Sequence, residues 1–301
     1  MNIIPSYTAP ITRNTPGLFG FVLDMSGSMS EPISFEGSQM RKCDALNVIV
    51  NRTIYELICR CRKFSGYYDY FQFFAIGYSD NQTVDLFEDT IGNGSVGSNI
   101  YSVNDLVSSM VEKKTFRRQF KDENDKIISS TYSVPQYLCP GAMGNTPMYQ
   151  ALRETHNITK KWLSIHGEGL SFPPMIIHIT DGDVTDAPVE EVLDVAEKIK
   201  GLSSGNGNVL ILNIHIGDDV INEEVITFPR NENELRCVKN ATDLFKMSSV
   251  FPETMLELVK KIKKADSIND VRNSRMMTFN SSMITILEAI NIGTISVANH
   301  I

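Results

Sequence analysis

The apolar run from Leu18 to Leu23 is the feature that most constrains the fold of this chain. A short, continuous apolar run that ends in a Gly/Ser-rich turn is typical of a buried strand. The turn that follows contains Asp24, Ser26 and Ser28, with Gly27 between the two serines. In an open α/β sheet the carboxyl ends of the strands are where ligands bind. The sequence therefore places three oxygen-bearing side chains at a typical binding position.

Strand-like and helix-like patterns alternate along most of the chain. Such alternation predicts an α/β fold with a doubly wound, mostly parallel central sheet and helices on both faces. The first strand ends at about Leu23, and further strands are expected at 67–78, 84–87, 175–179, 208–216 and 244–247, with helices at 39–64, 104–112, 148–165, 188–202, 232–240 and 252–264.

The 301 residues are enough for one large α/β domain with small additions at its ends. Residues 1–13 are rich in proline and form an extended lead-in, 14–264 form the α/β domain, and 265–301 form a small appendage with a helix over 282–292. Residues 88–137 are expected to be an insertion in the domain, with a hairpin around 123–125. Its basic residues are either an interaction surface or a solvated face: Lys113, Lys114, Arg117 and Arg118.

Charge and composition exclude several classes of protein. The net charge of −8 argues against a general nucleic-acid binder. No apolar stretch is long enough to span a membrane and the N-terminus lacks a signal-peptide pattern, so we expect a cytoplasmic protein. The five cysteines have no C-x-x-C spacing, which disfavours both disulfides and structural zinc. Cys59 and Cys61 are expected to be buried thiols.

Oxygen donors recur where the chain leaves a strand or enters a helix. Asp24, Ser26 and Ser28 follow the first strand; Thr146 precedes a helix that begins after Pro147; and Asp181 follows the strand 175–179. Hard oxygen donors of this kind suit a small divalent cation such as Mg²⁺. Taken alone, the first turn is equally compatible with an ordinary polar turn.

Together these residues resemble the metal-ion-dependent adhesion site of von Willebrand factor A domains, whose pattern is Asp-x-Ser-x-Ser, a distant Thr and a distant Asp. Longer segments look like the cytoplasmic bacterial branch of that family, in particular the proteins associated with tellurium resistance. Those segments are 144–148, 171–183, 208–216, 245–252, 278–280 and 291–294.

The resemblance implies a metal-dependent module for protein–protein interaction rather than an enzyme. In the family the two serines bind Mg²⁺ (or Mn²⁺) directly, the threonine binds directly or through water, and the aspartates act mostly through water. The ion then keeps positive charge, and a carboxylate of a partner protein completes its shell. The resemblance further suggests a role in tellurite or general stress response, beside kinase- or phosphatase-like partners. Asp183 and Asp186 could tune the site or contact the partner, or serve only in a turn and a helix cap.

Two other functions remain open on the sequence. A strand-end aspartate with Mg²⁺ is also found in haloacid-dehalogenase-type phosphatases, but these need a second acid where this chain has Ser26, and a serine is no general acid at neutral pH. The chain could instead recruit substrates for a partner ATPase through the same site. His178 and His215 are expected to be hydrogen-bonded core histidines, and Trp162 a core residue.

Overall fold

The computed structural model describes residues 6–35, 37–97, 99–109, 112–121, 127–167, 171–217, 225–235 and 241–279. Its centre is an eight-stranded sheet in the order β13-β14-β12-β11-β1-β6-β7, with β8 also paired to β6. The five strands from β14 to β6 run parallel, and β7, β8 and β13 pair antiparallel with them. The predicted α/β architecture with a mostly parallel sheet is therefore confirmed. The strands are β1 Gly17–Asp24, β6 Phe71–Ser79, β7 Gln82–Asp85, β8 Tyr101–Ser102, β11 Met175–Thr180, β12 Leu210–His215, β13 Ile226–Thr227 and β14 Met277–Phe279.

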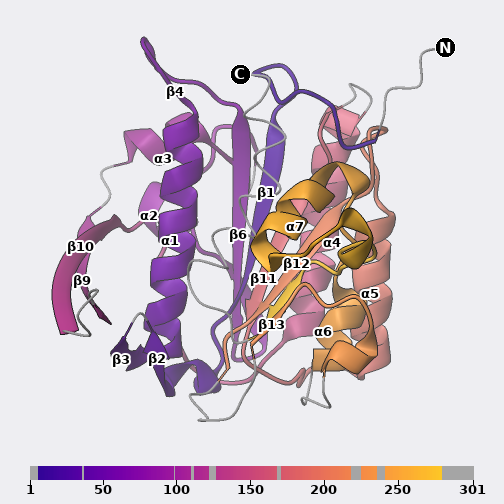
Figure 1. Cartoon of the computed structure of the whole chain (residues 1–301). Helices are drawn as coiled ribbons and strands as arrows, with labels where there is room; N and C mark the ends of the chain where they lie inside the picture. The colour runs from indigo at the N-terminus through magenta and orange to yellow at the C-terminus, as the bar shows by residue number, and fades with distance from the viewer. Residues whose placement is uncertain are drawn as a thin grey trace.

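Helices cover both faces of the sheet, with α1 on one side and α4 and α5 on the other (Figure 1). Because side chains alternate along a strand, Phe19 and Phe21 of β1 pack on the α1 side, whereas Leu18 and Val22 pack on the α4 side. Burial on both faces explains why these strands are almost continuously apolar. The helices are α1 Lys42–Arg60, α2 Glu88–Ile91, α3 Val103–Ser108, α4 Met148–His166, α5 Val189–Gly201, α6 Ala241–Met247 and α7 Leu256–Lys263.

Several elements differ from the sequence-based predictions, and the helix predicted to run to 64 ends at Arg60, before the short strand β4 Arg62–Lys63. Residues 39–41, predicted as the start of the first long helix, belong to strand β3 Ser38–Arg41, which forms a hairpin with β2 Pro32–Phe35. Residues 244–247, predicted as a strand, lie in α6, whose buried residues Ala241, Leu244 and Phe245 follow helical spacing. A short apolar run does not by itself distinguish a strand from a buried helix. Cys59, predicted to be buried, is exposed.

The insertion contains the predicted hairpin, formed by β9 Lys113–Lys121 and β10 Ile127–Pro135. It packs against the outer side of α1, away from the sheet (Figure 1). Its turn, with residues 123–125, lies outside the described residues. Lys113, Lys114 and Arg117 are exposed on β9, and the Lys114 ammonium lies 3.4 Å from the Asp44 carboxylate.

The segment after residue 264 contributes to the main sheet. β14 pairs in parallel with β12 and antiparallel with β13, so its three residues lie between two strands of the α/β domain. The predicted helix over 282–292 lies outside the described residues. At the other end, the lead-in is attached through Tyr7, whose backbone N–H donates to the Asn206 carbonyl at 2.7 Å.

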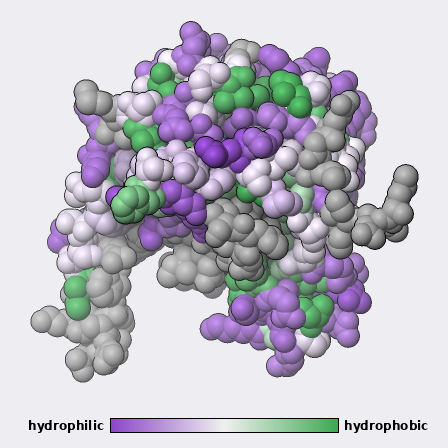
Figure 2. Space-filling view, turned by 90° about the horizontal axis from the view of Figure 1, so that it is seen from above, coloured by the Kyte–Doolittle hydropathy of each residue, from purple (hydrophilic) through white to green (hydrophobic). Residues whose placement is uncertain are grey.

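Among the described residues, no helix is both long and apolar enough to cross a bilayer. On the face seen in Figure 2, hydrophilic residues predominate and the hydrophobic atoms form separate spots. That face offers no large continuous apolar surface among the residues drawn in colour.

Candidate metal centre

Asp24 is the last residue of β1, and its side chain is completely buried. One carboxylate oxygen accepts the backbone N–H of Ser26 at 2.9 Å, and the other accepts the hydroxyl of Thr180 at 2.6 Å. Burial raises the pKa of Asp24, and the hydrogen bonds oppose that shift. A buried carboxylate held this way would be stabilised in its charged form by a nearby cation.

Ser26, Ser28 and Asp181 form a continuous chain of hydrogen bonds. The hydroxyl of Ser28 donates to Asp181 Oδ1 at 2.8 Å, and the two serine hydroxyls lie 3.1 Å apart. Since Ser28 uses its proton toward Asp181, Ser26 is the donor in the serine pair. Residues that are 153 positions apart in the sequence thus lie at one point, as the strand-end argument predicts.

The loop that contains Thr146 is joined to the other two donor-bearing loops by hydrogen bonds of its backbone. The Gly27 N–H donates to the carbonyl of Gly144 at 2.9 Å, which joins the Thr146 loop to the Ser26 turn. Thr146 N–H donates to the Thr185 hydroxyl at 2.9 Å, and Thr185 N–H donates back to the Thr146 carbonyl at 3.1 Å. The three donor-bearing segments are therefore held together by main-chain contacts.

Gly144 has the left-handed backbone conformation, with φ +67°, and a Cβ there would lie 2.6 Å from the Cβ of Asp80. Only glycine fits this turn without displacing the loop between β6 and β7. The position of Thr146, two residues later, therefore depends on a glycine.

The donor set fits a divalent cation such as Mg²⁺. All five predicted side chains offer hard oxygens, and in an octahedral shell with metal–oxygen distances of about 2.1 Å, adjacent oxygens lie about 3 Å apart. The oxygen separations of 2.8 Å and 3.1 Å between Asp181, Ser28 and Ser26 match that spacing. Asp24, Ser26, Ser28, Thr146 and Asp181 are the residues that would hold the ion.

The structure adds a residue that the sequence analysis did not identify, Lys42. Its ammonium lies 2.8 Å from Asp181 Oδ2 and 2.8 Å from Glu31 Oε2, and its side chain is only 3% exposed. The side chain of Asp181 is completely enclosed, while its backbone is partly exposed. One sequence signal could have identified Lys42. It lies in the first turn of a helix, where the helix dipole disfavours a cation. It was missed because the helix was predicted to begin at 39.

Asp183 and Asp186, the two accessory candidates, are exposed. Asp186 accepts the backbone N–H groups of Tyr149 and Gln150 at 3.1 Å and 2.9 Å. It therefore caps α4, whereas the sequence suggested a cap for the following helix, α5. The predicted cap of α5 is therefore wrong, and the cap observed on α4 ties the Asp181 loop to the helix that follows Thr146.

The histidines and the tryptophan belong to the core. His178 is fully buried between the hydroxyl of Tyr78 and Oδ1 of Asn213, each at 2.8 Å, and burial lowers its pKa to about 4. His215 stacks on Phe279 with ring centroids 3.8 Å apart. Trp162 is fully buried and donates to Gln72 at 2.6 Å.

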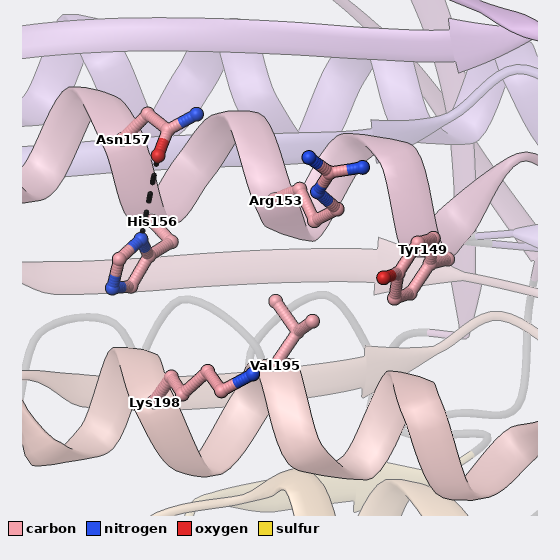
Figure 3. A pocket seen from close by; sticks show the side chains of 6 residues that line it. All are labelled: Tyr149, Arg153, His156, Asn157, Val195 and Lys198. Carbon is pink, nitrogen blue, oxygen red and sulfur yellow. Dashed lines mark hydrogen bonds between the residues drawn. The ribbon is translucent and has the colours of Figure 1, made fainter.

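Two grooves lie beside α4. One, of about 370 Å³, adjoins the candidate metal centre and is mainly apolar, with Asp183 and Asp243 in its lining. The other, of about 220 Å³, lies between α4 and α5 (Figure 3). Its charged groups are Arg153 and Lys198, and it has no carboxylate in its lining, so it is no second site for a divalent cation.

Within the described part of the chain, no three His, Cys, Asp or Glu side chains converge as a metal cluster. The candidate centre has only two carboxylates, Asp24 and Asp181, and its other donors are hydroxyls. A cation in this centre would be bound by carboxylate and hydroxyl oxygens together.

No family model matches the chain, and no curated protein does. Among solved structures it is similar to a von Willebrand factor type A protein from Catenulispora acidiphila, with 11% identity, a TM-score of 0.44, and coverage of 95% of this chain and 43% of that one. It is also similar to an uncharacterized membrane spanning protein from Vibrio fischeri, with 13% identity, a TM-score of 0.24, and coverage of 76% and 85%. The chain spans less than half the length of the Catenulispora protein.

Proposed function

We propose that the chain is a von Willebrand factor A type interaction module that binds Mg²⁺ or Mn²⁺ and, through the ion, an acidic group of a partner protein. The observation that carries the proposal is the row of oxygens from Ser26 through Ser28 to Asp181, at separations of 3.1 Å and 2.8 Å. These are hydrogen-bond distances, and because adjacent oxygens around Mg²⁺ lie about 3 Å apart, an ion could bind these oxygens with little movement. Asp24 and Thr146 complete the set.

The balance of charge supports binding to an acidic partner. Two of the five donors are carboxylates and three are neutral hydroxyls, and the Lys42 ammonium already pairs with one carboxylate. The resemblance implies that the hydroxyls bind the ion directly and the aspartates mostly through water, so the bound ion would keep positive charge toward an incoming ligand. A carboxylate of a partner is the oxygen ligand that such a charge prefers.

The surroundings of Asp24 support binding rather than phosphoryl transfer. A nucleophilic aspartate must reach the substrate with one oxygen, but both oxygens of Asp24 accept hydrogen bonds and the side chain has no exposed surface. The role through water that the resemblance implies for Asp24 needs no such direct contact. Ser26, two positions later, donates a backbone N–H to Asp24 and offers no acid for the leaving group.

The biological setting of the proposal rests on the sequence resemblance. It suggests a cytoplasmic bacterial protein of the tellurite or stress response that acts beside kinase- or phosphatase-like partners. A partner ATPase would use the same carboxylate-binding chemistry. These settings differ in the partner and share the site.

The test is metal binding by the full chain. We expect titration calorimetry to detect Mg²⁺ binding, and electron paramagnetic resonance to detect Mn²⁺ binding. In a Ser28→Ala variant the affinity should fall at least about tenfold, because a ligand and its hydrogen bond to Asp181 are lost. Ser30→Ala is the matched control, because Ser30 is exposed and its hydroxyl donates to the Gly27 carbonyl.

The partner chemistry is then tested with acetate as the simplest carboxylate. Acetate should displace water from the bound Mn²⁺ and lower its enhancement of water-proton relaxation, and a neutral amide such as acetamide should not. A chain that binds neither metal while circular dichroism shows a native fold would refute the proposal. Loss of binding in Ser30→Ala equal to that in Ser28→Ala would also refute it.

A further inference from the structure

Lys42 is a buried cation directly beside the candidate metal centre. Its ammonium contacts Asp181 Oδ2 at 2.8 Å, while the other oxygen of the same carboxylate accepts the Ser28 hydroxyl at 2.8 Å. Lys42 and Ser28 therefore contact the two oxygens of one carboxylate, that of Asp181. The charge of an ion in that row and the charge of Lys42 act on the same group.

The placement of Lys42 is energetically unfavourable for a lysine without a charge partner. Burying an ammonium is costly unless it is paired and hydrogen-bonded, and its side chain is only 3% exposed. Lys42 is also the first residue of α1, where the positive end of the helix dipole repels a cation. The carboxylates of Asp181 and Glu31 are what hold it there.

The β2–β3 hairpin delivers both Lys42 and Glu31 to the site. Pro32 pairs with Arg41 at the open end of the hairpin, so Glu31 and Lys42 lie next to each other just beyond it. The Lys42 N–H donates to the Glu31 carbonyl at 2.9 Å, which fixes the two backbones together. Glu31 differs from Asp181 in exposure, since its side chain is 53% exposed. It offers the ammonium a second carboxylate on the solvent side.

We propose that Lys42 is a tethered cation that competes with the divalent metal for Asp181. Without metal, the ammonium neutralises Asp181; with metal bound, the ammonium is held by Glu31 instead. This inference rests on the proposed metal-binding function. The metal affinity of the site would then depend on the β2–β3 hairpin, which positions Lys42 and Glu31, as well as on the five oxygen donors.

The charges give the direction of the effect. Asp24 and Asp181 carry two negative charges, which a divalent ion alone would balance. Glu31 adds a third negative charge, but its side chain is 53% exposed and solvent screens it, whereas Asp181 is enclosed. Within the enclosed part of the site, the ion together with the Lys42 ammonium would therefore exceed the charge of the two aspartates. Two cations that share a carboxylate repel each other strongly when solvent is excluded.

The experiment measures Mg²⁺ and Mn²⁺ affinity of the full chain with Lys42→Met, which keeps an unbranched side chain only one atom shorter and removes its charge. We expect affinity to rise on the order of tenfold, because unit charges a few ångströms apart at a partly enclosed site interact by more than the free energy of a tenfold change. Lys160→Met, at an exposed position of α4, changes the net charge equally and should leave affinity unchanged.

Glu31→Gln provides a second test that does not depend on the buried lysine being replaceable. Removal of the alternative carboxylate should lower metal affinity severalfold in the wild-type background. In the Lys42→Met background the same change should have a smaller effect, because no ammonium then needs Glu31. Such coupling in a double-mutant cycle is the signature of competition.

The outcomes separate the two proposals. Metal binding of equal strength in the wild type and Lys42→Met would overturn the competition and leave the metal site intact. Additive effects of Glu31→Gln and Lys42→Met would also overturn it. No binding in any of the folded variants would refute the metal site itself, and binding gained only in Lys42→Met would support both.

Discussion

His178 should make the stability of the protein depend on pH in a predictable way. The ring is fully buried in the middle of the sheet, on strand β11 between β1 and β12. Asn213 Nδ2 donates to Ser248, so its Oδ1 accepts from His178 Nδ1, and His178 Nε2 accepts the Tyr78 hydroxyl. In this arrangement the neutral ring accepts from Tyr78 and donates to Asn213, and burial in the sheet disfavours the charged ring.

Burial lowers the pKa of His178 from 6.5 to about 4. The unfolded chain therefore binds a proton at this residue between about pH 6.5 and pH 4, and the folded chain does not. Stability rises with pH wherever the unfolded state binds more protons, so this group makes stability fall as the pH falls through that window. Linkage gives a loss of about 2 kcal/mol between pH 7 and pH 5, which approaches about 3 kcal/mol near pH 4.

The assay is urea unfolding of the wild type and His178→Gln at pH 7 and pH 5 in chelator. Other groups also titrate, among them Asp24, whose raised pKa acts in the opposite direction, and His166, whose pKa burial lowers. They are present in both proteins, so the difference between the two pH dependences isolates His178. We expect His178→Gln to be less stable at pH 7 and to lose about 2 kcal/mol less than the wild type on acidification. Equal losses in the two proteins would refute the reasoning.

Two further substitutions test how the loops are held. Gly144→Ala should lower the free energy of unfolding by about 1–3 kcal/mol and weaken metal binding, because the new Cβ meets the backbone of Asp80 and displaces the Thr146 loop. Gly141→Ala, where the nearest atom to a Cβ is 3.9 Å away, is the control in urea unfolding, and equal effects would contradict the argument. Asp186→Ala should cost about 0.5–2 kcal/mol by removing the cap of α4, and Asp186→Asn should restore most of it. A thermal melt in which Asp186→Asn is as unstable as Asp186→Ala would show that the cap is not the cause.

The main sheet was predictable because its central strands are buried on both faces. Runs such as 18–23 and 208–216 are almost continuously apolar, and only a sheet with helices on both sides buries them. The short apolar run at 244–247 was misassigned, because four residues show no clear period. Residues 39–41 were misassigned because their pairing partner is β2, which the local pattern did not mark as a strand.

The structure brings Ser26, Ser28 and Asp181 together because polar residues at the carboxyl ends of parallel strands converge. Lys42 was not predictable in the same way. Its contact with Asp181 spans 139 positions and depends on a hairpin whose register local sequence does not fix. Asp186 shows the same limit, since it lies near α5 in the sequence and caps α4 in space. Whether the site binds a metal stays a prediction.

The main-chain bonds between the three donor loops have a consequence for redesign. Gly27 to Gly144 and Thr146 to Thr185 are joined through backbone groups, and these bonds do not involve the hydroxyls of Ser26 or Ser28. For the two serines, the groups that hold the loops and the groups that would bind an ion are therefore different atoms. Exchanges of the two serines, for instance Ser26→Asp to add a negative charge, leave these backbone bonds in place. Asp24 and Asp181 differ, because their carboxylates also hold the Ser26 backbone and the Lys42 ammonium. If the site binds a cation as proposed, Ser26 and Ser28 are the positions at which side-chain choice would alter its selectivity.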